Sequence, residues 1–324
     1  MNEYKFNRSK LKNRKSGISA FIRLKNGADT IGYVLDSHIN IFDEIVILLN
    51  GCTDLSFDVC NIYVEKYPGK IKLYHYEPEV YPFGGQKHKD EPEDSVHSFV
   101  NFSNYALQLT EYEYVMKLDD DHYCPVIYQS KDHFLNELKP DKVNMFSGIN
   151  LVWDEVGNVV ISKEYPLAGN GDHFIIKVDE NTFFKKNDTC EYFDYNNKKI
   201  NYIGLRYFHL KFLRKNFGFS NVINTTEGKI ISDEVKKMKT ISFSDFVNLC
   251  ESFRISGNKR YFDDTLISRV KERLSEFRLI LAVASALGSF KSRRAMRLSR
   301  DFQSINKLDT PELLRELFSE LKSK

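Results

Sequence analysis

The chain has 324 residues, of which 42% are hydrophobic and 28% are charged, with 16 Gly and 8 Pro. This composition is typical of a globular protein and excludes a disordered tail, a collagen and a long coiled coil. The net charge is +2, but residues 1–16 and 254–300 are basic and the rest of the chain is acidic. Such an uneven distribution indicates an anionic partner surface, either a nucleic acid or a membrane.

The cysteines and the apolar segments point to the cytoplasm. The five Cys residues lie far apart and form no CxxC pair, so we expect reduced thiols. The longest apolar run, Leu279–Leu287, is much shorter than the roughly 20 residues that span a bilayer. The basic segment Met1–Ser16 lacks the apolar core of a secretory signal. We therefore expect a cytoplasmic protein that can sit at the inner face of the membrane.

The first 125 residues alternate between predicted strands and predicted helices. Short apolar runs predict buried strands, and helical spacing or capping residues predict the helices between them. The predicted strands are Ile18–Ile22, Glu44–Leu49, Ile71–Tyr76 and Tyr114–Leu118, and the predicted helices are Asp29–Ile39, Thr53–Tyr67 and Asp94–Leu109. This order implies an α/β fold with a parallel sheet and helices on both faces.

Beyond residue 126 the pattern changes. Short runs separated by turn signals predict a mixed or antiparallel part of the sheet, with strands at Val143–Ile149, Asn158–Ser162 and His173–Val178. Residues 182–216 look helical, and from about residue 240 nearly the whole chain is predicted to be helical. We therefore expect a catalytic domain at 17–222, with halves 17–125 and 126–222. A basic helical region at 240–324 follows it.

The strongest chemical signal is the run Leu118-Asp-Asp-Asp-His122. Three adjacent carboxylates repel one another at a strand end unless a cation is bound, and Mg²⁺ and Mn²⁺ accept such oxygen ligands. A solvated turn is the alternative interpretation. The run Asn50-Gly-Cys-Thr-Asp54 follows the second strand. Ligands of open parallel sheets bind at the carboxyl ends of strands, so we expect both runs to reach one cleft.

These runs, with Asn104 in the helix before the acidic strand, resemble the nucleotide-sugar half of GT-A glycosyltransferases. The closest likeness is to the inverting family-two group that builds bacterial polysaccharides and lipopolysaccharides. The resemblance covers residues 17–125 well and extends weakly to about 215. It implies a Rossmann-like, mostly parallel sheet with a mixed part. The first strand departs from the family pattern, because Phe21–Asn26 replaces the usual apolar-Pro-x-Tyr-Asn.

The resemblance implies donor-binding residues. Asp54 matches the acidic residue that binds the nucleobase or ribose, and Asn104 matches an Asn near the donor site. Taken alone, Asp54 is equally well explained as a helix cap, and Asn104 as a capping or surface residue. Arg23 or Lys25, in the strand that departs from the pattern, is expected to approach the nucleotide.

The resemblance also implies a metal site that takes Mn²⁺ or Mg²⁺. Asp119 and Asp121 match the outer residues of the Asp-x-Asp motif, which bind the ribose and the metal on the diphosphate. Asp120 matches the middle position, which contacts the sugar. His209 resembles the histidine that ligates the metal in some members. A half-buried histidine on an aromatic helix face is the alternative.

The catalytic base and the acceptor site are less specified. Inverting members place an acidic base at a helix N-terminus, after a glycine loop that Gly169–Gly171 resembles. Glu191 stands at the expected distance and is ranked first, ahead of Asp194 and Asp172. Trp153 is the single Trp of the chain and is expected to stack on the acceptor sugar, although a core position explains it equally well.

The implied activity is metal-dependent transfer of a sugar from a nucleotide sugar, a UDP-sugar first. The acceptor is a glycan or a lipid-linked glycan, and the anomeric carbon is inverted. Basic residues around Phe277–Phe290 suit a helix lying on an anionic leaflet, so residues 269–300 are the expected membrane contact. A helix packed on the catalytic domain is the alternative for that segment.

Three rival functions remain to be weighed. A sugar-nucleotide pyrophosphorylase and an Asp-x-Asp phosphatase would need motifs that this sequence lacks. The remaining alternative is a non-catalytic adaptor that binds a membrane or a nucleic acid through its basic segments. Because no nucleic-acid motif is present, we expect no nucleic-acid partner.

Overall fold

The computed structural model describes residues 3–82, 86–163, 165–169, 173–187, 191–214, 238–252 and 293–323. Four of the expectations above concern other parts of the chain. Asp172, two residues of the expected glycine loop Gly169–Gly171, the apolar segment Phe277–Phe290 and most of the expected domain boundary lie outside the described residues. The division into domains therefore stays a prediction.

The expected sheet is confirmed. Its strands follow the order β13-β7-β6-β9-β4-β1-β2-β3, and β12, β5 and β8 branch from this path. The parallel part consists of β1 (Lys15–Leu24), β2 (Glu44–Leu49), β3 (Ile71–His75) and β4 (Tyr112–Lys117). The mixed part consists of β5 (His122–Tyr123), β6 (Val143–Trp153), β7 (Val159–Ser162), β8 (Leu167–Ala168), β9 (Phe174–Lys177), β12 (Ile200–His209) and β13 (Thr240–Ile241). The switch occurs at β9, which lies antiparallel to both β4 and β6.

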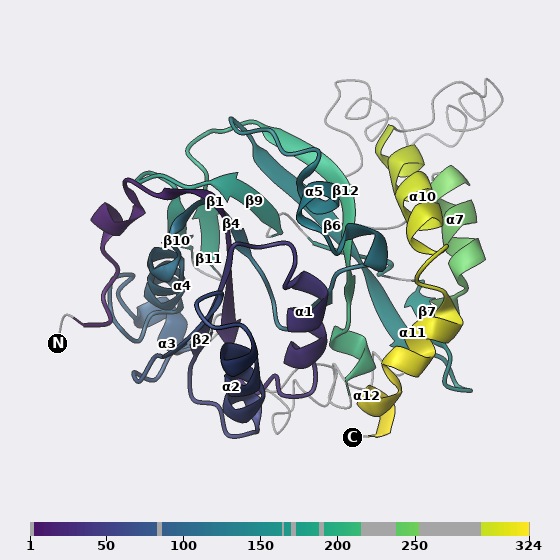
Figure 1. The fold of residues 1–324 in the computed structure, drawn as a ribbon, viewed down its shortest axis with the longest axis horizontal. Coiled ribbons are helices and arrows are strands. Elements are labelled where there is room, and N and C mark those ends of the chain that lie inside the picture. The colour runs from purple at the N-terminus through teal and green to yellow at the C-terminus, as the bar shows by residue number, and fades with distance from the viewer. Residues whose placement is uncertain are drawn as a thin grey trace.

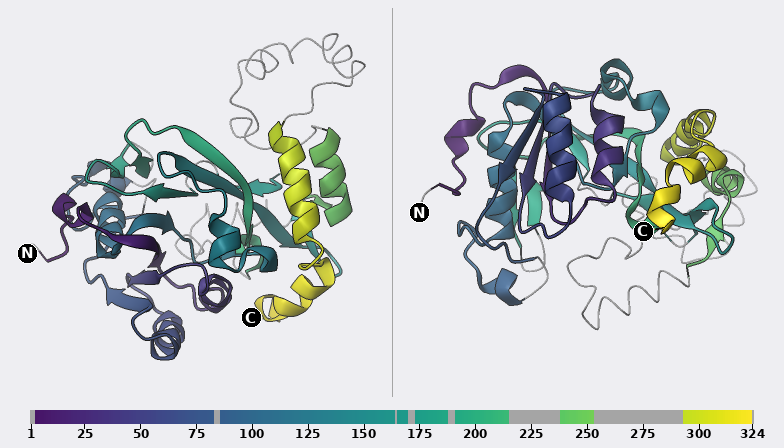
Figure 2. Two further views of the ribbon diagram at one scale, coloured as in Figure 1. Left: turned by 45° about the horizontal axis from the view of Figure 1, so that its top comes forward. Right: turned by 60° about the horizontal axis from the view of Figure 1, so that its bottom comes forward.

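Helices cover both faces of the parallel part, as Figures 1 and 2 show. The side chains of β1 alternate between two core clusters: Ile18, Ala20 and Ile22 join one, and Phe21 joins the other. Because successive residues of a strand point to opposite faces, each cluster has its own helices. The first is covered by α1 (Ile31–His38) and α2 (Ser56–Lys66), and the second by α4 (Phe99–Leu109). Shorter segments connect these elements: η1 (Arg8–Leu11), α3 (Gln86–Asp90), η2 (Val126–Tyr128), α5 (Lys131–Leu135) and η3 (Lys211–Leu213).

The helical prediction for residues 182–216 is wrong. This segment contains β10 (Phe183–Lys186) and β11 (Glu191–Asp194), which pair as an antiparallel hairpin, and then the long strand β12. Asn196 and Asn197, which have φ of 50° and 57°, make the turn between β11 and β12. The aromatic and β-branched residues of β12 favour a strand, and pairing with β6 over seven positions decides the outcome.

Helices at the C-terminal end pack against the mixed part of the sheet (Figures 1 and 2). They are α7 (Phe243–Ser252), α10 (Arg293–Ile305), α11 (Pro311–Leu317) and α12 (Ser319–Ser323). Phe246 and Phe302 meet edge to face with ring centroids 4.8 Å apart and share a core cluster with Leu205 of β12. The expected C-terminal helical region is therefore confirmed in its described part. No described helix is both long enough and apolar enough to cross a bilayer.

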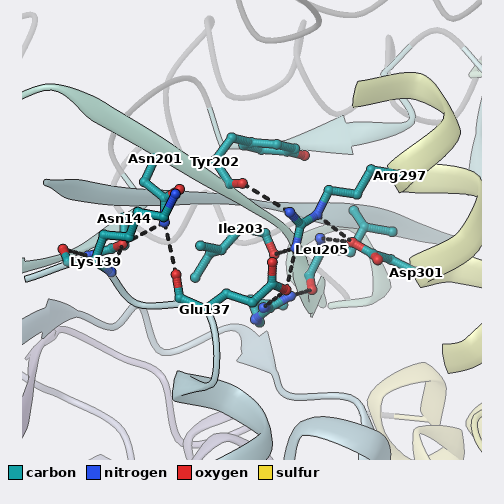
Figure 3. Close-up of polar contacts among 10 residues, drawn as sticks. Glu137, Lys139, Asn144, Asn201, Tyr202, Ile203, Leu205, Arg297 and Asp301 are labelled. Atoms are coloured by element: carbon teal, nitrogen blue, oxygen red, sulfur yellow. Dashed lines mark hydrogen bonds and ion pairs between the residues drawn. The ribbon is translucent and has the colours of Figure 1, made fainter. Parts of the chain in front are cut away.

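Polar side chains of α10 hold the backbone of β12, as Figure 3 shows. Arg297 donates hydrogen bonds to the carbonyl oxygens of Tyr202 (3.3 Å) and Ile203 (3.0 Å). Asp301 accepts a hydrogen bond from the backbone N–H of Leu205 at 3.1 Å. These contacts satisfy backbone groups at an irregular point of β12, where its pairing with β6 shifts register.

A buried arginine lies beneath this contact. The side chain of Arg206 is 1% exposed, and its guanidinium lies over the Tyr128 ring at 4.4 Å. Glu137 accepts from Arg206 at 3.2 Å and also pairs with Arg297. Burying a guanidinium costs free energy unless a carboxylate and other acceptors face it, so Glu137 couples the α5–β6 connection to α10.

Asp309, which follows α10, is expected to make the free energy of unfolding depend on pH. Its carboxylate accepts from the backbone N–H of Val126 at 3.0 Å, and burial raises its pKa to about 6. The folded chain therefore holds the proton of Asp309 more tightly than the unfolded chain does. The stabilisation from this group is complete below pH 4 and is lost as the pH rises through 6.

Asp309→Asn removes this titration while keeping an oxygen for Val126. We expect the variant to gain stability relative to the wild type as the pH rises from 4 to 7, by up to about 2 kcal/mol. Urea denaturation at several pH values measures the difference. A constant difference between the two proteins at all pH values would contradict the assignment.

Candidate active site

The acidic run follows β4 at the carboxyl end of the parallel sheet. The backbone N–H of Leu118 donates to Phe21 O at 3.0 Å, so the run starts beside β1. The next strand, β5, pairs antiparallel with the end of β12, with His122 opposite His209. This pairing brings the run against residues that lie about 90 positions further along the chain.

Asp121 and His209 face each other. Asp121 Oδ2 lies 3.3 Å from His209 Nε2, and both side chains are largely buried. Asn150 fixes the imidazole: its Nδ2 donates to Tyr165 O, so its Oδ1 faces His209 Nδ1 at 2.6 Å. With a hydrogen on Nδ1, the Nε2 atom can share a proton with Asp121 or give its lone pair to a cation.

The pKa of Asp121 reflects these neighbours. Burial raises it, but the charge and hydrogen bond of His209, together with His122, outweigh burial and hold the pKa below its ordinary value. Asp121 is thus a carboxylate that positive groups keep ionised. Such a carboxylate is suited to a cation.

Asp119 lies among cationic and imidazole groups. Its Oδ2 lies 3.4 Å from both Lys117 Nζ and His173 Nε2, and 3.7 Å from His122 Nε2. Burial raises the pKa of Asp119, yet Lys117 and the two histidines hold it well below its ordinary value. His122 is completely buried, and burial lowers its pKa well below the usual range.

Asp120 points in another direction, toward Arg214 and Gly27. Its Oδ2 lies 3.5 Å from Arg214 Nη1, and Arg214 also pairs with Asp29. Burial and the charge of Asp121 raise the pKa of Asp120 to about 7, although Arg214 opposes them. A Cβ at Gly27 would lie 2.2 Å from Asp120 Oδ2, so the glycine is what allows the close approach.

A cavity of about 200 Å³ opens above these residues. Its lining combines two carboxylates of the acidic run with four cationic side chains and several apolar groups. The lining residues are Arg23, Leu24, Lys25, Asn50, Val80, Pro82, Phe99, Phe102, Asp120, Asp121, Lys211 and Arg214. The mixture suits a ligand that carries phosphate charge and a flat or apolar part.

Arg23 and Lys25 line the cavity, where the sequence led us to expect one of them. Arg23 lies over the Phe99 ring at 4.7 Å and donates to Ser103 and Glu191. Glu191 is the first residue of strand β11 and not the start of a helix, so that part of its prediction is wrong. Glu191 does not belong to the cavity lining, but it pairs with Arg23, which does.

Two expected donor residues are engaged elsewhere. Asp54 is exposed, and its carboxylate accepts from the backbone N–H groups of Ala28 and Ser56, both at 3.0 Å. Asn104 is buried, and its amide makes two hydrogen bonds to the backbone of Phe184. Neither residue lines the cavity. Both side chains instead bind backbone groups of the fold: Asp54 at the start of α2, and Asn104 between α4 and β10.

Asp194 and Trp153 lie away from the cavity. Asp194 pairs with Lys185 at 2.6 Å across the β10–β11 hairpin. Trp153 ends β6 and donates its Nε1 hydrogen to Leu213 O at 2.9 Å. Neither residue belongs to the cavity lining.

Sequence reasoning missed four groups that the structure brings to this region: His122, His173, Lys211 and Arg214. His122 directly follows the acidic run, and its position beside three carboxylates is a signal that could have found it. His173 opens a predicted strand, which places it at a strand end. Lys211 and Arg214 follow β12, which had been predicted to be helical, so they gave no such signal.

The comparison with protein families identifies a family that matches most of the chain. The family model described as "CgtA: Beta-1,4-N-acetylgalactosaminyltransferase (CgtA)" matches residues 2–253. These residues include the acidic run, β12 and α7. No curated protein matches the chain.

Solved structures give partial matches. One is the mannosyltransferase PcManGT from Pyrobaculum calidifontis in complex with GDP-Man and Mn²⁺, at 17% identity over 43% of this chain and 36% of that chain, with a TM-score of 0.30. Another is glucosyl-3-phosphoglycerate synthase from Mycobacterium tuberculosis in complex with Mn²⁺, UDP and glucosyl-3-phosphoglycerate, at 17% identity over 43% and 46%, with a TM-score of 0.27. The chain spans less than half the length of both.

Proposed function

Since the chain belongs to the family of CgtA beta-1,4-N-acetylgalactosaminyltransferases, we propose that it transfers N-acetylgalactosamine from a nucleotide-sugar donor to a glycan hydroxyl. Membership makes the chain a glycosyltransferase, as its sequence led us to expect. The observation that carries the proposal is the Asp121–His209 pair, whose Asp121 lines a cavity together with four cationic side chains. The acceptor we propose is a glycan or lipid-linked glycan of a bacterial surface polysaccharide or lipopolysaccharide.

The cavity supports a nucleoside diphosphate as the donor's leaving group. Arg23, Lys25, Lys211 and Arg214 supply positive charge to the two phosphates. The Phe99 and Phe102 rings supply flat apolar surface on the same lining. We propose a UDP-sugar as the donor.

Mn²⁺ or Mg²⁺ is the proposed cofactor. The site offers two ligand atoms that suit such an ion. They are a carboxylate oxygen of Asp121 and Nε2 of His209, whose ring is oriented by Asn150. A mixed oxygen and nitrogen set favours Mn²⁺ over Mg²⁺. When bound, such a cation would stabilise the negative charge of the departing nucleoside diphosphate.

The proposed reaction inverts the anomeric carbon. A nucleotide sugar with an α linkage gives a β-linked product in one displacement, and the family description names a beta linkage. One carboxylate must then accept the proton of the acceptor hydroxyl. Glu191 is the first candidate, because its partner Arg23 lines the cavity.

Glu191→Gln tests the base. We expect transfer to fall about 10²- to 10⁴-fold, since a positioned base contributes that much, while donor binding persists. Asp194→Asn is the competing variant on the same hairpin. The pH profile separates the roles, because loss of the base removes the acidic limb of the kcat profile. A loss in Asp194→Asn alone would move the role to Asp194, and no loss in either would favour Asp172.

A thermal-shift panel tests the donor class. The chain is heated with UDP, GDP, CMP, dTDP or ADP, each with and without Mn²⁺. Because a ligand that binds the folded state raises the unfolding midpoint, we expect a shift with UDP that requires Mn²⁺. UDP-N-acetylgalactosamine, compared with UDP-glucose and UDP-galactose in a transfer assay, then tests the sugar.

The opposite outcome identifies the rival function. If a folded sample shows no shift with any nucleotide, the chain is an adaptor with a transferase-like domain. Vesicles with anionic lipids and duplex DNA are the probes for that case. Residues 269–292 lie outside the described structure, so membrane contact through 269–300 stays a proposal, which cosedimentation with anionic vesicles tests.

A further inference from the structure

The pair Asp121–His209 accounts for only part of the histidine cluster. A second set of three groups, Asp119, His122 and His173, also has ligand atoms within 4.8 Å of one another. The two sets share His122, whose Nε2 lies 3.7 Å from Asp119 and 3.9 Å from Asp121. The proposed reaction uses neither His122 nor His173.

His122 is the anomaly of this cluster. Its side chain is completely buried, and among the residues that the structure describes neither ring nitrogen has a hydrogen-bond partner. The ring is held from two sides, by Tyr207 with centroids 3.9 Å apart and by His173 with centroids 4.4 Å apart. An unpartnered buried polar atom costs free energy, and Nε2 faces two carboxylates at distances too long for hydrogen bonds.

His173 is oriented in the way that metal-binding histidines are. Its Nε2 lies 3.4 Å from Asp119, and its Nδ1 bonds to the hydroxyl of Tyr207. His209 shows the same arrangement, with Asn150 at its Nδ1. Ligating histidines generally have their second nitrogen held by such an outer partner, which fixes the tautomer and the ring.

We propose that Asp119, His122 and His173 form a second cation site, next to the Asp121–His209 site, and that it takes a transition-metal ion. Two imidazole nitrogens and one carboxylate favour Zn²⁺, Co²⁺ or Mn²⁺ over Mg²⁺ or Ca²⁺. Metal–ligand bonds of about 2.1 Å place neighbouring ligand atoms about 3–3.5 Å apart. The observed separations of 3.4 and 3.7 Å are close to this range.

The Lys117 ammonium is the positive charge beside which a second cation would have to lie. Lys117 and His173 both contact Oδ2 of Asp119, and a carboxylate has a second oxygen for another partner. The side chain of Asp119 is 32% exposed, which gives an ion a route of entry. A neutral imidazole is the form that ligates a metal ion.

Metal stoichiometry tests the proposal without any nucleotide. The full chain, stripped with a chelator, is dialysed against Co²⁺, and bound metal is counted by mass spectrometry. The wild type should bind one ion more than His173→Gln and one more than His209→Gln. The double variant should lose both ions. If His173→Gln binds as much Co²⁺ as the wild type while His209→Gln loses an ion, the second site does not exist.

Two outer-partner variants keep the test independent of misfolding. Tyr207→Phe removes only the hydroxyl at His173, and Asn150→Ala removes the amide at His209. Each should weaken its own site about 10- to 100-fold and leave the other unchanged. Equal weakening of both sites by either variant would refute two separate sites. These metal-binding experiments contain no nucleotide sugar, so a negative result would not bear on the proposed transfer reaction. A negative result in the nucleotide panel would likewise not bear on the second cation site.

Discussion

Asp121→Asn is expected to reduce transfer at least about 10³-fold and to remove the Mn²⁺-dependent shift with UDP. The substitution keeps the shape of the side chain but removes the charge that faces His209 at 3.3 Å. A bound cation contributes several kcal/mol to stabilising charge in the transition state. A loss of about 4 kcal/mol corresponds to 10³ in rate.

We expect the thermal stability of Asp121→Asn to be retained although its transfer activity is lost. Asp121 lies beside Asp119 and Asp120, and the charge of Asp121 raises the pKa of Asp120. Removing the charge of Asp121 relieves repulsion with its two neighbours but also removes its favourable contact with His209, so we expect the unfolding midpoint without ligand to change little. Loss of function with retained stability is the usual sign of a strained functional site.

Asp58→Asn is the matched control. Asp58 is exposed in the first turn of α2, and the same chemical change there should leave transfer and the Mn²⁺-dependent shift as in the wild type. Initial rates at saturating donor and thermal shifts in both proteins provide the comparison. Wild-type transfer by Asp121→Asn would refute the assignment of the metal site.

Local sequence pattern was sufficient for the parallel half of the fold. β2 has the bounds that its apolar run predicts, and β4 ends directly before the acidic run. β2 is buried throughout and β4 in its second half. The position of Asp119–Asp121 at the sheet's carboxyl edge followed from that order alone.

The second half of the site depended on contacts that no local pattern contains. His209 reaches Asp121 because β12 pairs with β5 and β6. The aromatic residues of β12 fit a helix face as well as a strand, so the segment was predicted as helix, and tertiary pairing overrides such weak preferences. Asn104 and Asp54 matched family positions, but their polar atoms are used by nearby backbone groups. A motif gives a residue's position, and only packing shows what its side chain contacts.

Gly204→Ala is expected to cost about 2–4 kcal/mol of stability. Gly204 lies at the irregular point of β12 and has φ of +85°, a conformation that costs alanine about 1–2 kcal/mol. An added Cβ would lie 1.9 Å from Asp301 Oδ2 and 2.7 Å from Arg297 Nε. Displacing these side chains would leave the backbone groups of β12 that they bind without partners (Figure 3), which costs about 1–3 kcal/mol of stability.

Gly32→Ala is the control for this variant. Gly32 lies in α1, and the nearest atom to an added Cβ is Tyr63 Oη at 3.6 Å, an ordinary contact. Alanine there should be neutral or stabilising by up to about 1 kcal/mol. Urea denaturation of both variants gives the two free energies. A Gly204→Ala protein as stable as the wild type would show that α10 does not hold β12 through these contacts.

The double variant Gly204→Ala/Asp301→Ala separates strain from contact. Part of the destabilisation by Gly204→Ala should come from displacing Asp301 from the N–H of Leu205. If so, the double variant should lose less stability than the sum of the losses in the two single variants. Full additivity would place the whole cost in the backbone of Gly204. Because β12 carries His209 five residues after Gly204, a loosened α10 contact should also weaken Mn²⁺ binding. Metal affinity measured in the same variants therefore tests whether the described C-terminal helices support the metal site through β12.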